Sequence, residues 1–267
     1  MSIQFFTPRG PRNEVLRLPS SLRRTVKWLP RIGDIFPDFT VETTQGVIRF
    51  WDWAEGHWVH LFSHPAAHTP ICTTELVSIS ASASAWDACN VRHMALTGST
   101  VAEQVAWHEE IEAFFGTPID VPGAHDPALQ LTRLFGMRHE KQSTEFSIRK
   151  SFIIDPAQRI RMIFEYPINI GRNTEEVLRV IKALQMSTRT GAATPADWHD
   201  GDPVFIKDDR SEQDVVDVFG TGSLRLTPYL RVVTPQQGRT AMAGMAPPRR
   251  PRSETGATAI AVSLQSA

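Results

Sequence analysis

Cys72 is the residue of this sequence best placed for covalent chemistry, because it falls in the first turn of an expected helix. Residues 58–62 (WVHLF) have the length and the aromatic and β-branched content of a buried strand. Residues 76–86 then repeat apolar side chains at helical spacing. The first turn of a helix has unpaired backbone N–H groups and the positive end of the helix dipole, and both favour a thiolate over a thiol. The sequence therefore predicts a nucleophilic thiolate suited to attack on a small electrophile.

The residues just before the cysteine support this interpretation. Thr69 can direct its hydroxyl at the sulfur or at an oxygen bound beside it. Pro65 and Pro70 stiffen the connection from strand to helix and remove two competing backbone donors. The segment is thus expected to be a rigid loop that presents few other groups to the reacting atom.

The spacing of these residues resembles a known motif. Pro65-x-x-x-Thr69-x-x-Cys72 resembles the active-site motif of the peroxiredoxins, and the longer string FSHPxxxTPxCTTEL (residues 62–76) is similar to the form of the one-cysteine subfamily. The resemblance extends over about residues 33–233. It implies an α/β protein with a thioredoxin-like fold and a small C-terminal dimerisation domain, and a thiol-dependent peroxidase without a cofactor.

The same resemblance implies a set of site residues. Arg149 occupies the family's active-site arginine position, where it donates to the thiolate and the bound peroxide, and a fixed guanidinium fork suits both roles. Arg172, in YPxxxGRN, matches a second arginine motif of the subfamily. His64 either forms a hydrogen bond beside the pocket or is a satisfied core histidine. The expected catalytic residues are Cys72, Thr69, Arg149 and Pro65, and the expected substrate-binding or supporting residues are His64, Arg172 and Glu75.

The elements that must position these residues follow from the chain's patterning. Strands are predicted at residues 58–62, 91–96 and 119–121, with helices between them, and this alternation implies a largely parallel sheet covered on both faces. Thr100 and Glu103 form a capping box for a helix that runs to about residue 115.

After this alternation of strands and helices, the sequence predicts a β-hairpin. Residues 149–154 and 160–166 are strand-like, and the turn signal Asp155-Pro156 separates them, so they should pair antiparallel. Asn173 caps a last helix through residue 186. A βαβ unit followed by ββα is the thioredoxin arrangement.

Four segments are expected along the chain. Residues 1–32 form a basic N-terminal extension, 33–190 the thioredoxin-like peroxiredoxin domain, 191–235 the C-terminal peroxiredoxin domain, and 236–267 a tail rich in Ala, Gly, Pro and Arg that should be disordered. In the family, the C-terminal domain packs on the partner subunit, so the resemblance implies a homodimer or a higher homo-oligomer.

Cys89 is the second of two cysteines, and it follows Cys72 by 17 residues. In a continuous helix that separation is roughly 25 Å, beyond the ~7 Å between Cα atoms that a disulfide can bridge. No cysteine follows Cys89, so an external thiol of the thioredoxin, glutaredoxin or glutathione system should reduce the oxidised protein. Cys89 is predicted to be a buried residue at a helix end.

The sequence does not favour a metal site or a lipase-like site. His57, His60, His64 and His68 precede Cys72 at intervals that suggest a metal, but His60 lies in the predicted strand and no second ligand cluster is near, so no metal site is expected. Some one-cysteine members resemble lipases through a Gly-x-Ser-x-Gly string. His57 stands at the serine position here, so the acyl nucleophile is missing.

Composition bounds the partners and the location. The formal net charge is -1 and the pI is near 6.8, which does not indicate nucleic acid as a partner. No apolar run approaches the roughly 18 residues that span a bilayer. Two cysteines fit a reducing compartment, so a cytoplasmic location is expected; the Arg-rich, acid-poor N-terminus offers the mitochondrial matrix as an alternative.

The functional prediction is a peroxidase that reduces hydrogen peroxide and alkyl hydroperoxides for cell redox homeostasis. Cys72 becomes a sulfenic acid, and the external thiol restores it. Two alternatives share the fold: a peroxide sensor or holdase chaperone in which oxidation changes assembly, and a thioredoxin-like binding module with an inert cysteine.

Overall fold

The computed structural model describes residues 29–236, and these fall into two compact units, residues 29–172 and 173–236. The predicted segments 1–32 and 236–267 lie largely outside the described residues. The predicted domain boundaries therefore remain a prediction.

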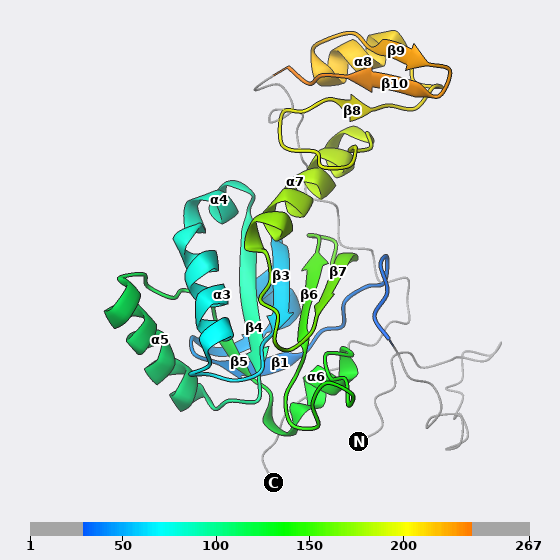
Figure 1. Cartoon of the computed structure of the whole chain (residues 1–267). Helices are drawn as coiled ribbons and strands as arrows, with labels where there is room; N and C mark the ends of the chain where they lie inside the picture. Colours follow the sequence, from blue (N-terminus) through cyan, green and yellow to red (C-terminus); the bar gives the residue numbers. More distant parts are fainter. Residues whose placement is uncertain (1–28, 237–267) are drawn as a thin grey trace, which may run out of the picture. The chain divides into compact units, whose positions relative to one another are not determined.

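The first unit is built on a seven-stranded sheet with the order β2-β1-β5-β4-β3-β6-β7 (Figure 1). Strands β3, β4 and β5 are parallel, and β6 pairs antiparallel with both β3 and β7. The strands are β1 (Thr40–Thr43), β2 (Gly46–Arg49), β3 (Trp58–Ser63), β4 (Val91–Thr97), β5 (Gly123–His125), β6 (Arg149–Ile154) and β7 (Ile160–Tyr166). The predicted hairpin is confirmed with its bounds unchanged, and the thioredoxin-like fold is confirmed with it.

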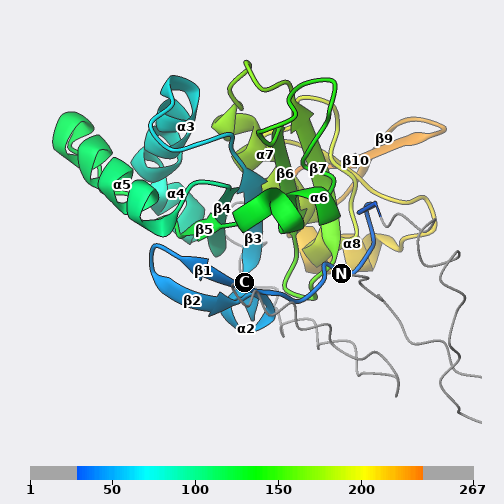
Figure 2. The same ribbon diagram turned by 90° about the horizontal axis from the view of Figure 1, so that it is seen from below.

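Helices cover both faces of this sheet. Figures 1 and 2 show α3, α4 and α5 on one face, with α2 and α6 on the other. The helices are α2 (Phe50–Ala54), α3 (Pro70–Ala81), α4 (Ala83–Ala88), α5 (Val101–Phe115) and α6 (Gln130–Leu134), with a 3-10 turn, η1 (Pro127–Leu129), before α6. The face under α2 and α6 holds a cluster of buried phenylalanines with ring centroids 4.8 to 6.4 Å apart: Phe36, Phe39, Phe50, Phe135 and Phe152.

Three expectations for this unit are wrong. The sheet is mixed and not largely parallel, because only the β3–β4 and β4–β5 pairs are parallel while the other four pairs run antiparallel. The strand predicted at 119–121 begins instead at Gly123, because Pro122 can accept a backbone hydrogen bond from Ala95 but has no N–H to donate to a ladder. The helix after Cys72 is also not continuous to Cys89, since it breaks at Ser82 into α3 and α4. The end-to-end distance assumed for one helix therefore does not apply.

The second unit contains α7 (Thr174–Thr190), β8 (Val204–Phe205), α8 (Glu212–Phe219), β9 (Leu224–Thr227) and β10 (Leu230–Val233). Its three strands form a separate antiparallel sheet with the order β8-β10-β9. Asn173 caps α7 as predicted, and the helix runs four residues beyond its predicted end, to Thr190, with Gly191 as a left-handed C-cap. The unit has its own core, which includes Met186 of α7, Trp198, Val215 and Phe219.

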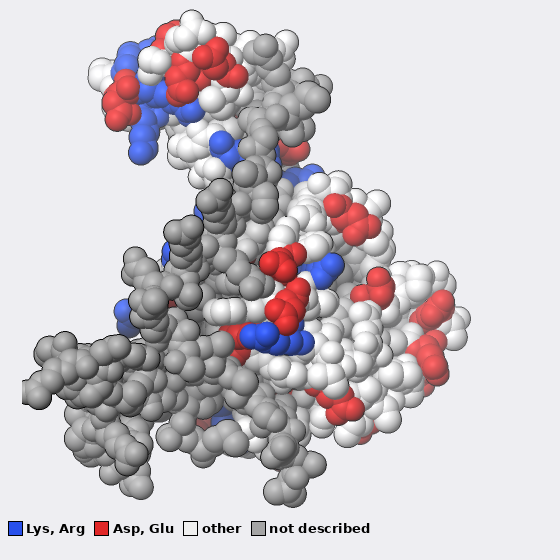
Figure 3. Space-filling model, turned by 180° about the vertical axis from the view of Figure 1, so that it is seen from behind, with Lys and Arg blue, Asp and Glu red and all other residues white. Residues whose placement is uncertain are grey.

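The described surface carries mixed charges. Figure 3 shows Lys and Arg interspersed with Asp and Glu, between wider uncharged areas, on the face that it draws. Within residues 29–236, no helix is long and apolar enough to cross a membrane. Over the same range, no group of three or more His, Cys, Asp or Glu side chains is arranged to hold a metal ion.

Candidate active site

Cys72 is the third residue of α3 and is buried, with 1% of its surface exposed. Thr69 precedes the helix in an extended conformation, and Pro70 occupies the first helical position, where its missing N–H is not needed. The sulfur thus lies at the positive end of α3, as predicted. In this structure both cysteines are free thiols.

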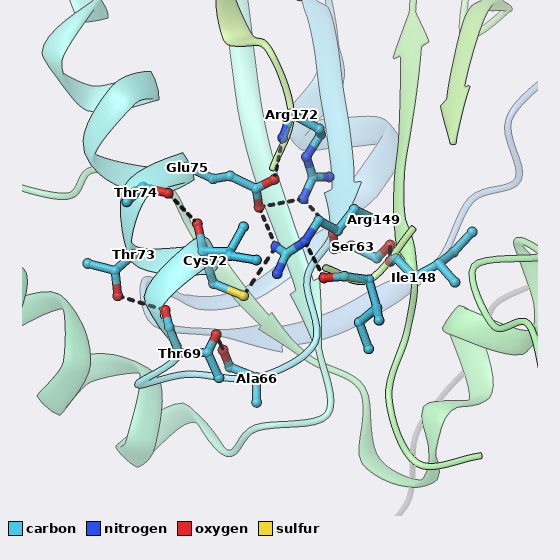
Figure 4. Close-up of polar contacts among 12 residues, drawn as sticks. Ser63, Ala66, Thr69, Cys72, Thr73, Thr74, Glu75, Ile148, Arg149 and Arg172 are labelled. Atoms are coloured by element: carbon cyan, nitrogen blue, oxygen red, sulfur yellow. Dashed lines mark hydrogen bonds and ion pairs between the residues drawn. The ribbon is translucent and has the colours of Figure 1, made fainter. Parts of the chain in front are cut away.

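Arg149 reaches the sulfur from the start of β6 (Figure 4). Its Nη1 lies 3.4 Å from Cys72 Sγ and 2.7 Å from Glu75 Oε2, and its Nε donates to the Ile168 carbonyl at 2.8 Å. Arg149 is 2% exposed. Three acceptors around one planar group fix its orientation, so a donor is held directed at the sulfur.

Glu75 joins the two arginines. Its Oε2 accepts from Arg149 Nη1 at 2.7 Å and from Arg172 Nη2 at 2.9 Å, while its Oε1 accepts from the Arg172 backbone N–H at 2.9 Å. Glu75 lies one turn after Cys72 on α3, which places both on the same side of the helix. The four side chains Cys72, Glu75, Arg149 and Arg172 therefore form one hydrogen-bonded cluster.

Arg172 is held from several directions. Its Nη2 also donates to the Ser63 carbonyl at 2.8 Å, and its guanidinium lies over the Phe62 ring, 4.8 Å from the centroid. Burial lowers the pKa of Arg172 from its ordinary value, and the Glu75 carboxylate opposes that effect. Because an arginine side chain keeps its proton in proteins, the cluster contains two cations.

The other predicted residues line the loop between β3 and α3. The Thr69 hydroxyl donates to the Ala66 carbonyl at 2.9 Å, so in this conformation it can offer the sulfur or a bound oxygen only its lone pairs. The Pro65 carbonyl accepts from Thr97 Oγ1 at 3.3 Å. None of the bonds described for Thr69 and Pro65 joins them directly to the sulfur.

His64 is a buried neutral side chain beside this loop. Its ring packs against Trp107, with centroids 5.4 Å apart, and its backbone N–H donates to the Leu96 carbonyl. Burial first, and then the positive charge of Arg172, lowers the pKa of His64 to about 3. His64 is therefore uncharged at neutral pH.

Sequence reasoning missed several residues that support the cluster. Ser63 contributes its carbonyl to Arg172, and Ser151 Oγ accepts from Arg172 Nη1 at 3.3 Å. Trp107 donates from Nε1 to Thr73 Oγ1, which ties α5 to the first turn of α3. A signal existed for Ser151, because it lies two residues after Arg149 in a strand and therefore shares its face.

Comparison with known proteins gives consistent matches over both units. Residues 32–163 match the AhpC/TSA family, and residues 183–222 match the C-terminal domain of 1-Cys peroxiredoxin. A peroxiredoxin of Aquifex aeolicus is 41% identical over 170 residues, which is 64% of this chain and 77% of the relative.

Two solved structures are similar in fold as well. A cysteine-to-serine mutant of peroxiredoxin 6 of Arenicola marina has a TM-score of 0.71 at 30% identity, covering 78% of this chain and 99% of the other. The yeast mitochondrial 1-Cys peroxiredoxin, studied for thiol resolution via glutathione/thioredoxin systems, has a TM-score of 0.69 at 34% identity, covering 76% and 99%.

Proposed function

The chain belongs to the AhpC/TSA family and to its one-cysteine peroxiredoxins, which are thiol-dependent peroxidases, and we propose that Cys72 is the residue that attacks the peroxide. The observation that carries this proposal is the contact of 3.4 Å between Arg149 Nη1 and Cys72 Sγ, with both side chains buried. The proposed substrates are hydrogen peroxide and alkyl hydroperoxides.

The reaction begins with the Cys72 thiolate attacking the terminal oxygen of the peroxide. A sulfur–oxygen bond forms as the O–O bond breaks, and two electrons pass from sulfur to the leaving oxygen, which takes up a proton and departs as water or an alcohol. The donors of Arg149 stabilise the charge that moves onto the leaving oxygen. The Thr69 hydroxyl, whose proton goes to the Ala66 carbonyl, helps to hold the peroxide in line by accepting from its O–H group. Cys72 is left as a sulfenic acid.

An external thiol completes the cycle. It attacks the sulfenic sulfur, water leaves, and a second thiol reduces the mixed disulfide. Thioredoxin, glutaredoxin or glutathione are the proposed reductants, and the glutathione/thioredoxin systems of the yeast relative support that class. Because Cys72 is 1% exposed, the loop before α3 must open before a protein thiol can reach the sulfur.

Assembly and location are proposed on similar grounds. The C-terminal domain match supports a homodimer or a higher homo-oligomer. A cytoplasmic location remains the proposal, and the mitochondrial matrix remains the alternative that the yeast mitochondrial relative supports.

Stopped-flow peroxide kinetics test the proposal, with a dimedone-type probe to trap the oxidised residue and mass spectrometry to map it. Replacing Cys72 by Ser should abolish peroxide consumption, because no other residue of the cluster is a nucleophile. The matched control is Cys89→Ser, which should turn over at nearly the wild-type rate. A Cys89→Ser protein without turnover would contradict the one-cysteine assignment. Slow turnover with oxidation-dependent capture of partner proteins would instead favour the sensor or holdase function.

A further inference from the structure

A row of polar side chains, two of them buried and one partly buried, crosses three central strands, and the mechanism above does not use it. His93 on β4, His60 on β3 and Ser151 on β6 make up this polar row. His60 Nδ1 lies 3.2 Å from His93 Nδ1, and His60 Nε2 lies 3.0 Å from Ser151 Oγ. Ser151 is fully buried and His60 is 1% exposed.

Strand register explains why these three side chains meet. His60 pairs directly with His93 across β3 and β4, and Ser151 pairs with Phe62, two residues after His60. Paired residues share a face of the sheet, and so do residues two apart in a strand. Arg149 lies two residues before Ser151, so the polar row lies on the face that carries Arg149 to the cysteine.

The polar row ends on Arg172. Arg172 Nη1 donates to Ser151 Oγ at 3.3 Å, whereas Nη2 donates to Glu75 and Ser63. Contacts at both terminal nitrogens fix the rotation of the guanidinium plane. Glu75 Oε2 accepts from both Arg172 and Arg149. A shift of Arg172 would therefore move the Glu75 carboxylate, and with it the Arg149 Nη1 donor that faces the sulfur.

The chemistry of the donors sets the direction of each hydrogen bond in the row. An arginine can only donate, so Ser151 Oγ accepts from Arg172 and has its own proton left to give to His60 Nε2. His60 then carries its proton on Nδ1, directed at His93 Nδ1. Burial, followed by the charges of His93 and Arg172, lowers the pKa of His60, and burial lowers the pKa of His93 to about 3. Both rings are therefore neutral. Neutral rings fit the row, because each side chain in it donates one hydrogen bond to the next.

We propose that Ser151 and His60 are positioning residues of the peroxidatic centre, which hold Arg172 and, through Glu75, align Arg149 with Cys72. This inference rests on the proposed function of Cys72. The row does not carry protons to the sulfur, because Arg172 and Arg149 lie between the row and Cys72 and an arginine keeps its proton. The polar row acts through geometry. It fixes the direction of the Arg149 donors toward the charge that develops on the peroxide, and small displacements of such donors change the reaction rate strongly.

The test measures two properties of the full-length protein, the second-order rate of peroxide consumption and the pH profile of Cys72 alkylation by iodoacetamide. The groups that face Cys72 are Arg149, Glu75, Arg172 and the neutral His64. If Arg149 is less ordered, its donor should stabilise the Cys72 thiolate less. Ser151→Ala and His60→Leu should each slow peroxide consumption about tenfold and move the alkylation midpoint to higher pH by about one unit.

Two further variants separate positioning from simple packing. His60→Gln places an amide oxygen where Nε2 accepts from Ser151, so it should restore most of the rate and of the alkylation profile. Ser80→Ala is the matched control, since Ser80 has a buried hydroxyl on α3 without a hydrogen-bond partner in the described structure, and it should behave as wild type. Circular dichroism and thermal melting report whether each variant is folded.

A folded Ser151→Ala protein with the wild-type rate and profile would overturn the inference, and so would an equal effect of Ser80→Ala. If His60→Leu does not fold, Ser151→Ala and His60→Gln decide the question. A wild-type protein that does not consume peroxide would remove the proposed function, and the alkylation profiles would still show whether the polar row acts on Cys72.

Discussion

At the scale of single residues, the site is a problem of buried charge. Arg149 and Arg172 bring two cations into the interior, and Glu75 supplies one anion between them. The sulfur of Cys72, 3.4 Å from Arg149 Nη1, is a further acceptor beside these cations. Since leaving a buried charge unpaired costs several kcal/mol, the cluster depends on this set of contacts.

After Cys72, Arg149 is the residue whose replacement should slow the reaction most. Arg149→Lys keeps the positive charge, but a single ammonium cannot reproduce the bonds to Cys72, Glu75 and Ile168 together. We expect the rate of peroxide consumption to fall about 100-fold, as when one transition-state donor is lost. Stopped-flow kinetics measure it. Arg49→Lys, at a half-exposed arginine paired with Asp38, is the control and should leave the rate unchanged. A rate within about twofold of wild type for Arg149→Lys would show that only the charge is needed.

At the scale of elements, α5 supports the first turn of α3 from outside. The Thr100 hydroxyl accepts from the Glu103 backbone N–H at 3.2 Å, and Glu103 Oε2 accepts from the Thr100 N–H at 2.7 Å, which completes the predicted capping box. Trp107, two turns along the same helix, bonds Thr73 of α3. The start of α5 is thus coupled to the segment that holds the cysteine.

Thr100→Ala should therefore lower stability more than activity. Loss of the cap leaves backbone donors unpaired, and we expect the free energy of unfolding to fall by about 1 kcal/mol. Urea denaturation followed by circular dichroism measures this change, and peroxide kinetics should stay within about twofold of wild type. Thr117→Ala, just beyond the end of α5, is the control and should change neither. A folded Thr100→Ala protein whose peroxide rate falls well beyond about twofold would instead show that α5 helps to set the catalytic geometry.

At the scale of the whole molecule, the buried histidines make the first unit sensitive to acid. Burial lowers the pKa of His64 and His93 to about 3 and that of His60 in the same direction, while unfolded histidines titrate near 6.5. Below pH 6.5 these histidines bind protons in the unfolded state but stay neutral in the folded state. Stability is therefore complete above about pH 6.5 and falls as the pH drops toward 3.

The expected slope is about 1.4 kcal/mol per pH unit for each buried neutral histidine. Urea unfolding at pH 7.5, 6.0 and 5.0, followed by a signal from the first unit, measures it. His57→Gln, at a histidine outside the core, should keep the wild-type slope. Unfolding free energies that do not change between pH 7.5 and 5.0 would contradict burial of these rings in the folded state in solution.

Local chemistry was readable from the sequence because it depends on residues close together in the chain. The loop before Cys72, the capping box at Thr100 and the turn at Asp155 each follow from a few neighbouring side chains. The motif around Cys72 is local in the same sense, whereas Arg149 was expected only because the family resemblance implies it. The break at Ser82 was not, because the apolar spacing continues across it and no proline or glycine marks it.

Only the tertiary structure decided how distant residues meet. Glu75 and Arg172 are 97 residues apart, and Ser151 and His60 are 91 apart, so nothing local relates them. Their contacts arise from the pairing of β4, β3 and β6 and from the loop that returns Arg172 to α3. Strand register fixes which side chains face one another, and register is set by packing of the whole sheet. For that reason the sequence by itself predicted Cys72 and its helix and, through the family resemblance, the arginines, while the folded sheet decided how Glu75, Ser151 and His60 connect them.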